Sequence, residues 1–146
     1  MELNFERIIR LKKIKIEKSE LLEEEEVLST PILTDKNLIH EIYWIFAEIL
    51  SEIDFSPNVE CVTQRKKFLF IILSLFAPGA LADGRMPNGL RKVIESVFPD
   101  IRPCTISNNL KDVIFLYQQY KDFRKDIEYL YTEILNRLRF KGLINQ

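Results

Sequence analysis

The feature that most constrains the fold is a C-terminal run from about 105 to 141 that contains neither Pro nor Gly. Its apolar and aromatic residues recur at alternating steps of three and four, with Arg124 in one of the slots: Leu110, Val113, Tyr117, Tyr120, Ile127, Tyr131, Ile134 and Leu138. This spacing places one apolar face along an α-helix. At about 1.5 Å per residue, the pattern predicts one continuous helix roughly 50 Å long. Thr105 or Ser107 is expected to cap its start, and Gly142 its end.

A helix of that length exceeds the width of one small domain, so part of its apolar face needs cover from outside a single core. We therefore expect self-association or binding of a protein partner through the distal part of the helix, from about Ile127 to Leu138. Aromatic side chains are enriched at such interfaces. The candidate interface residues are Tyr117, Tyr120, Phe123, Ile127, Tyr131, Ile134 and Leu138.

The rest of the chain also favours helices. Only four Gly and six Pro occur in 146 residues, and alternating strand patterns are scarce, so we expect an all-α fold with a single helical domain over 31–146. It should hold five or six helices in all. Apolar helices near 35–53 and 63–77 should form the core against the front half of the long helix. A loop at 54–60, flexible turns at 78–89 and a short helix at 90–98 complete the pattern.

An acidic, amphipathic N-terminal segment over 1–30 precedes this domain. It reads either as one helix or as a short strand around 13–17 followed by a helix. The run Glu23 to Glu26 is either a solvated face or a recognition surface for a basic partner. Residues 1–60 hold 7 Lys/Arg against 14 Asp/Glu, whereas residues 61–146 hold 14 against 8. Halves of opposite charge make head-to-tail association an option.

Other classes of protein are disfavoured. The apolar stretch 68–82 spans 15 residues and is broken by Pro78-Gly79, which is short of the roughly 20 that a membrane span needs, so we expect a buried core helix. The start lacks the basic and apolar regions of a secretory signal. With Cys61 and Cys104 expected to be reduced thiols, a cytoplasmic location follows.

No catalytic set stands out. His40 is the only histidine and has no Asp, Cys or Ser partner close in sequence, and the turns at 78–89 lack the pattern of a phosphate-binding loop. We therefore expect a non-enzymatic protein with no metal, no cofactor and no small-molecule substrate.

Residues 90–111 give the best functional hint. A short helix, Leu90 to Phe98, is followed by a turn and then by Thr-Ile-Ser-Asn-Asn-Leu-Lys at 105–111. This resembles the helix-turn-helix unit of DNA-binding proteins, whose second helix commonly opens with a Thr-Val-Ser-x-x-Leu-like sequence. The resemblance implies that Ile106 and Leu110 face inward and that the second helix meets DNA. Base edges would be contacted by Asn108 and Asn109, and phosphates by Ser107, Lys111, Arg91, Lys92 and Arg102.

Two functions are thus in competition. The first is a small DNA-binding or regulatory protein that uses the helix-turn-helix-like unit. The alternative is a structural or interaction subunit of a larger assembly, cellular or viral, that contacts its partners through the aromatic C-terminal helix. In the second case the sequence Ser107-Asn108-Asn109 simply caps a long helix.

Overall fold

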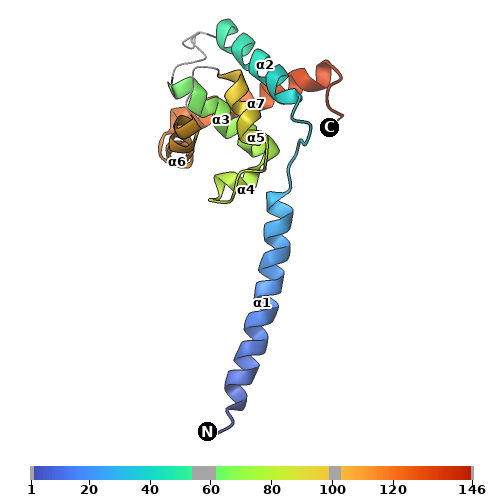
Figure 1. Cartoon of the computed structure of the whole chain (residues 1–146), viewed down its shortest axis with the longest axis vertical. Coiled ribbons are helices and arrows are strands. Elements are labelled where there is room, and N and C mark those ends of the chain that lie inside the picture. Colours follow the sequence, from blue (N-terminus) through green and yellow to red (C-terminus); the bar gives the residue numbers. More distant parts are fainter. Residues whose placement is uncertain (1, 54–61, 99–102, 146) are drawn as a thin grey trace. The chain divides into compact units, whose positions relative to one another are not determined.

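The computed structural model describes residues 2–53, 62–98 and 103–145, and these ranges contain helices and no strand (Figure 1). The helices are α1 (Phe5–Ser29), α2 (Leu38–Glu52), α3 (Val62–Phe76), α4 (Pro78–Leu81), α5 (Leu90–Val97), α6 (Pro103–Gln119) and α7 (Lys121–Phe140). The expected all-α class is confirmed. The described residues form seven helices rather than five or six, because of the short α4 and a break near the C-terminus. The chain divides into two compact units, Met1–Thr30 and Pro31–Gln146.

The first unit is one helix, α1, which settles the choice between a helix and a strand followed by a helix. Asn4 caps its start, because its Oδ1 accepts a hydrogen bond from the backbone N of Arg7 at 3.1 Å. At the other end, the Thr30 hydroxyl donates to the carbonyl of Glu26 at 2.8 Å. Pro31 follows at once, so the helical hydrogen-bond pattern cannot continue. No residue of α1 is buried.

The core of the second unit is built on α2 and α3. The buried face of α2 consists of Leu38, Ile39, Ile42, Ile45, Phe46, Ile49 and Leu50. From Phe68 onward, where its sequence is apolar apart from Ser74, helix α3 is buried on nearly all sides, and it ends at Phe76, just before Pro78. Phe68 lies at the centre, with its ring centroid 5.4–5.7 Å from those of Tyr43, Phe46 and Phe98.

The prediction of a single long helix over 105–141 is wrong, because this segment is divided at Tyr120 into α6 and α7. Tyr120 has an extended backbone, with φ −112° and ψ 109°. Arg124 stabilises the break: its Nε donates to the carbonyl of Tyr117 at 3.1 Å, and one Nη to that of Gln118 at 2.9 Å. Carbonyls at a helix end have no partner within the helix, so the guanidinium caps α6. Arg124, which interrupts the apolar spacing in the sequence, is therefore the residue that stabilises the turn between α6 and α7.

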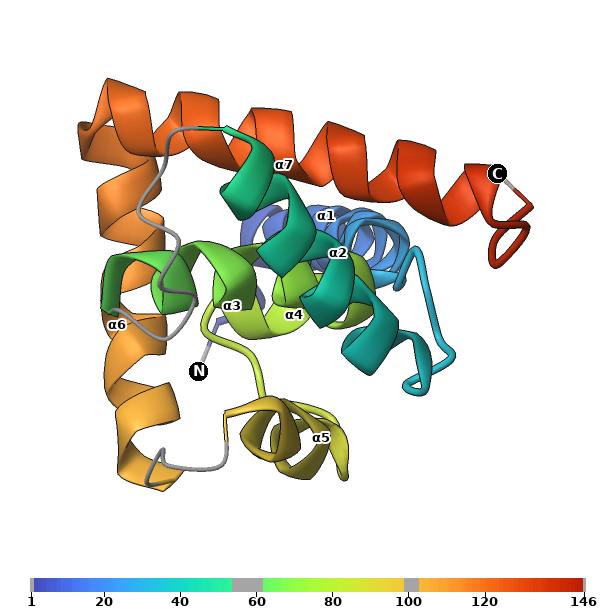
Figure 2. The same ribbon diagram turned by 90° about the horizontal axis from the view of Figure 1, so that it is seen from above.

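The break lets α7 turn away from the direction of α6 and pack against α2 and α3, while α6 packs against α3 (Figure 2). The core therefore uses both parts of the predicted long helix rather than its front half alone. Ion pairs tie α7 to α2: Arg137 contacts Glu52 at 2.6 Å and Glu48 at 3.5 Å.

Two predicted helix caps have different outcomes. Gly142 has φ +73° and follows the end of α7, where the backbone N of Leu143 donates to the carbonyl of Leu138 at 3.0 Å. The predicted C-cap is thus confirmed. Neither Thr105 nor Ser107 begins the sixth helix, because α6 starts at Pro103. The predicted loop at 54–60, both cysteine side chains, Arg102 and most of the predicted connection at 99–103 lie outside the residues whose structure is described.

Candidate interaction surfaces

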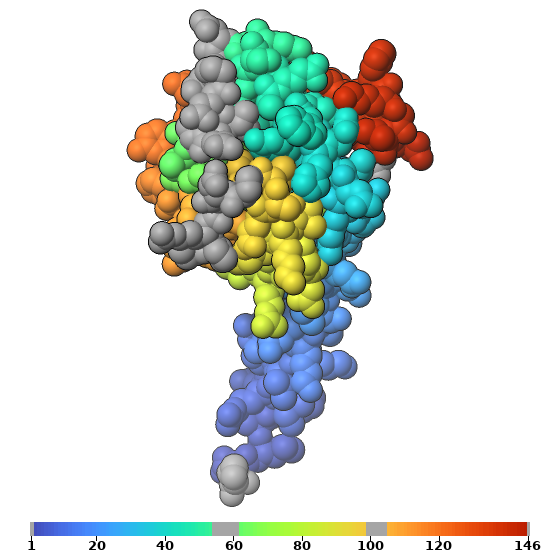
Figure 3. All heavy atoms as spheres, turned by 45° about the horizontal axis from the view of Figure 1, so that its top comes forward, coloured from blue at the N-terminus to red at the C-terminus, as the bar shows by residue number. Residues whose placement is uncertain are grey.

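The helix-turn-helix-like unit corresponds to α5 and the start of α6. Helix α5 lies beside α2 on one face of the domain (Figure 3) and buries Leu90, Ile94 and Val97. A hydrogen bond of 2.8 Å from an Nη of Arg91 to the hydroxyl of Ser107 joins α5 to α6. Ile106 is fully buried, as expected. Leu110 is half-buried against the same core.

The residues expected to contact DNA do not all lie on the surface. Lys92, Asn108 and Lys111 are exposed. Asn109 is only 5% exposed, so the expectation that it projects outward is wrong. The reason is helical spacing, because residue 109 lies between Ile106 and Val113 on the buried face. Its Nδ2 has no hydrogen-bond acceptor among the described residues.

The predicted C-terminal interface is mostly core. Phe123, Ile127, Ile134 and Leu138 are buried within the domain, so the expectation that the stripe from Ile127 to Leu138 extends beyond one core is wrong. The turn at Tyr120 explains this, since it lets α7 pack against α2 and α3.

The tyrosines of that predicted interface differ from one another. Tyr117 is half-buried, with its ring stacked on Phe70 at a centroid distance of 4.6 Å. Burial and a hydrogen bond donated to Glu128 raise the pKa of Tyr117. Tyr131 is also half-buried, and burial raises its pKa. Only Tyr120 is exposed, in an edge-to-face pair with exposed Phe115 at 6.4 Å.

The richest exposed apolar surface lies on α1. Nine of its large apolar side chains are at least 49% exposed: Phe5, Ile8, Ile9, Leu11, Ile16, Leu21, Leu22, Val27 and Leu28. The sequence predicts an amphipathic segment here, but it predicts the partner interface on the C-terminal helix. The missed signal was that these apolar residues are spread around α1 instead of forming one stripe that a single core could cover.

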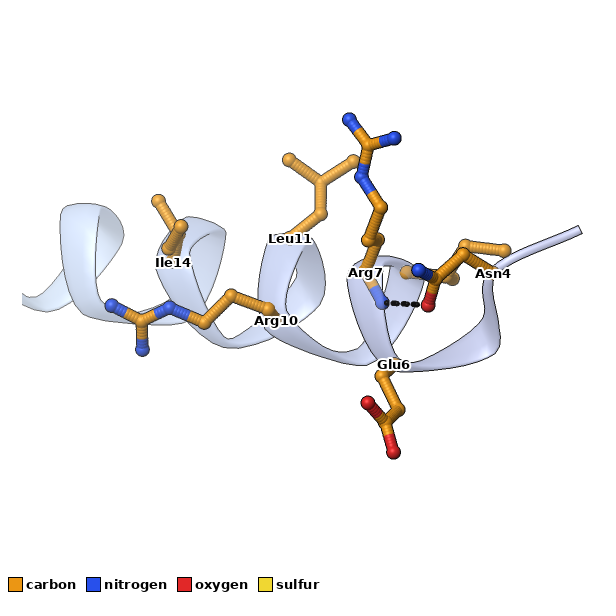
Figure 4. Close-up of a pocket in the computed structure, with 7 residues that line it drawn as sticks. Asn4, Glu6, Arg7, Arg10, Leu11 and Ile14 are labelled. Carbon is orange, nitrogen blue, oxygen red and sulfur yellow. Dashed lines mark hydrogen bonds between the residues drawn. The ribbon is translucent and has the colours of Figure 1, made fainter.

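A shallow hollow lies near the start of α1. It is lined by Asn4, Glu6, Arg7, Ile8, Arg10, Leu11 and Ile14, and Figure 4 shows that these all come from α1 and the residue that caps it. Ligand sites are normally enclosed by walls from several elements. A hollow with one wall is instead part of the outer surface of the helix itself.

The charges of α1 divide along its length. Its first part holds all six basic residues, Arg7, Arg10, Lys12, Lys13, Lys15 and Lys18, with the acidic residues Glu6 and Glu17; its last part holds only acidic ones, Glu20, Glu23, Glu24, Glu25 and Glu26. All of them are exposed. This order opposes the helix dipole, which favours acidic groups near the start of a helix and basic groups near its end.

His40 has a partner that the sequence did not predict: its Nε2 lies 3.0 Å from the hydroxyl of Ser96. That hydroxyl donates its one proton to the carbonyl of Val93, so it accepts from His40. A serine that accepts from a histidine is not activated as a nucleophile, because activation needs the histidine to accept the hydroxyl proton.

No group of three or more side chains suited to a metal ion occurs among the described residues. Within the same ranges, no helix combines the length and the apolar character that crossing a bilayer requires. Comparisons with protein-family models, with curated protein sequences and with solved structures gave no match to this chain.

Proposed function

We propose that this protein is a non-enzymatic association module, a subunit of a larger assembly that docks onto a protein partner through α1. The observation that carries the proposal is a helix of 25 residues with no buried residue and many exposed large apolar side chains. Exposed apolar surface of this extent is unfavourable in water and is typical of interaction sites. No metal, cofactor or small-molecule substrate forms part of this function.

The charges of α1 support the same function. Like charges stand three residues apart along it, for example Lys12 and Lys15, or Glu20 and Glu23. Such neighbours repel each other on a helix surface, and the order of charges opposes the helix dipole. Most helical stability in proteins comes from packing of an apolar face rather than from the helix itself. A partner that covers α1 would supply that packing.

Substitutions in α1 test whether it belongs to the domain core. We expect Leu11→Gln, Leu21→Gln and Leu28→Gln together to change the free energy of unfolding of the domain by less than about 0.5 kcal/mol, as exposed substitutions do. Urea unfolding followed by the fluorescence of Trp44, the single tryptophan, measures this. The control Leu130→Gln in buried α7 should cost several-fold more. If the α1 variant lost more than about 2 kcal/mol, α1 would be part of the core and the proposal would fail.

DNA binding by α5 and α6 is the second candidate. The observation that favours it is the hydrogen bond from Arg91 to Ser107, which joins the two helices of the unit. Its remaining exposed contacts would be Lys92, Asn108 and Lys111.

Binding to a DNA duplex at two salt concentrations tests this second candidate. Phosphate contacts must give an affinity that falls steeply as salt rises. Asn108→Ala should then cost about 1–3 kcal/mol on a preferred sequence only, whereas Lys111→Ala should weaken all sequences alike. Absence of binding at low salt removes DNA from consideration.

A further inference from the structure

We propose that the partner of α1 is the α1 of a second copy of this chain, and that the two helices pack antiparallel. This inference rests on the proposed docking function of α1 and names its partner. It depends on three features of α1: uncovered apolar residues at heptad spacing, charges separated along the helix, and near-equal amounts of opposite charge in its two parts.

The apolar spacing suits a helix as the partner. Four apolar residues of α1, at positions 11, 14, 21 and 28, lie on the series 11, 14, 18, 21, 25 and 28, whose steps of three and four are the heptad pattern of a coiled coil; the other exposed apolar residues of α1 lie outside this seam. Leu11, Leu21 and Leu28 are well exposed there, and Ile14 is half-exposed. The apolar surface of this seam is therefore available to a second helix. Polar residues hold the two remaining positions, Lys18 and Glu25. Polar seam residues lower stability but restrict register and partner.

The charges decide the orientation. Residues 5–18 hold six basic and two acidic residues, whereas residues 19–29 hold five acidic and no basic ones. A parallel pair would place basic halves together and acidic halves together. An antiparallel pair places each basic half beside an acidic half, which is attractive over the whole length. It also brings cations to the acidic end of each α1, where the helix dipole favours them.

The balance between the halves favours a second copy over an unrelated partner. A two-fold symmetric interface must be complementary to itself, because both sides present the same surface. A helix whose first half is basic and whose second half is similarly acidic meets this condition when one copy is reversed.

Charge-reversal variants of the full chain test the proposal by sedimentation equilibrium across micromolar concentrations. The acidic variant carries Lys12→Glu, Lys13→Glu and Lys15→Glu; the basic variant carries Glu23→Lys, Glu24→Lys and Glu25→Lys; the swapped variant carries all six. Wild type should approach the mass of a dimer, twice 17.3 kDa. The acidic and basic variants should each dimerise at least about tenfold more weakly, because like charges then face each other.

The swapped variant is the decisive one. After the swap, residues 5–18 hold three basic and five acidic residues, and residues 19–29 hold three basic and two acidic ones. Opposite net charges therefore face each other again in an antiparallel pair, so the swapped variant should dimerise more strongly than the acidic or the basic variant, although more weakly than wild type. A partner with a fixed charge pattern would instead bind it worst of all. As a matched control, Lys92→Glu with Lys111→Glu changes exposed charges of the domain and should leave the dimer intact.

Two results overturn the inference. If the swapped variant stays as weak as the acidic and basic variants, α1 does not pair antiparallel with itself. A wild-type chain that stays monomeric also excludes the pair, and hydrogen exchange of that monomer separates the two proposals. If the α1 amides are unprotected, the docking function remains but requires a different partner. If they are protected, α1 packs against its own domain, and both the docking function and the antiparallel pair are excluded.

Discussion

At the scale of single residues, Arg124 sets the path of the C-terminal third of the chain. Its guanidinium caps α6 through two carbonyls and lies 5.6 Å from the centre of the Tyr117 ring. We expect Arg124→Ala to lower the free energy of unfolding by about 1–3 kcal/mol, because two carbonyls lose charged donors. Urea unfolding measures this loss. Neighbouring Lys125 is exposed, so Lys125→Ala is the control and should change stability little. Equal losses in both variants would contradict the capping role.

A second residue-scale prediction compares two lysine–aspartate pairs. Lys67 and Asp126 are 2.9 Å apart, with the lysine side chain only 6% exposed, whereas Lys66 and Asp112 are 3.3 Å apart at a more exposed site. Asp126→Asn should cost about 1–3 kcal/mol, since it removes the carboxylate that faces a buried charge. Asp112→Asn should cost less than about 1 kcal/mol. Thermal or urea unfolding of both variants measures the two losses of stability. A larger loss for Asp112→Asn than for Asp126→Asn would show that burial does not set the strength of these ion pairs.

At the scale of elements, the pairing of α2 with α7 makes stability depend on pH. A hydrogen bond from Arg137 holds the pKa of Glu52 below its usual value. A lowered pKa in the folded state gives a contribution that is present above the pKa of the unfolded chain, about 4.3, and is lost as pH falls through the folded value. Glu52→Gln should therefore be less stable than wild type at neutral pH, and the difference should shrink below about pH 4.

Unfolding in urea at neutral and acidic pH tests this dependence. Glu95→Gln is a matched control, because Glu95 forms no ion pair among the described residues. A difference between wild type and Glu52→Gln that is the same at both pH values would rule out the contribution of the Arg137 contact.

Element by element, the sequence predicted what depends on local spacing. The buried α3, the inward face of α5 and the turn at Gly142 follow from apolar runs, helical periodicity and a glycine that can adopt positive φ. The break at Tyr120 does not, since no Pro or Gly marks it and the cap on α6 comes from a side chain of the next helix. The burial of Asn109 follows from its position between Ile106 and Val113 on the inward face of α6, whereas the polarity of its side chain predicts exposure.

At the scale of the whole molecule, the turn at Tyr120 brings the apolar stripe of α7 into the domain core, and the largest set of exposed large apolar side chains lies on α1. The domain over 31–146 buries the stripe of α7 in its own core. The core of this domain accounts for the apolar residues of α7, whereas no residue of α1 is buried. Association through α1 is therefore the central claim.

Hydrogen–deuterium exchange of the full chain at low and high micromolar concentration tests that claim most directly. We expect the amides of α2, α3 and α7 to be protected at both concentrations, because they belong to the domain core. The amides of α1 should exchange fast in the dilute sample and become protected in the concentrated one, as a second copy covers them. Protection of α1 that is the same at both concentrations would contradict association between copies.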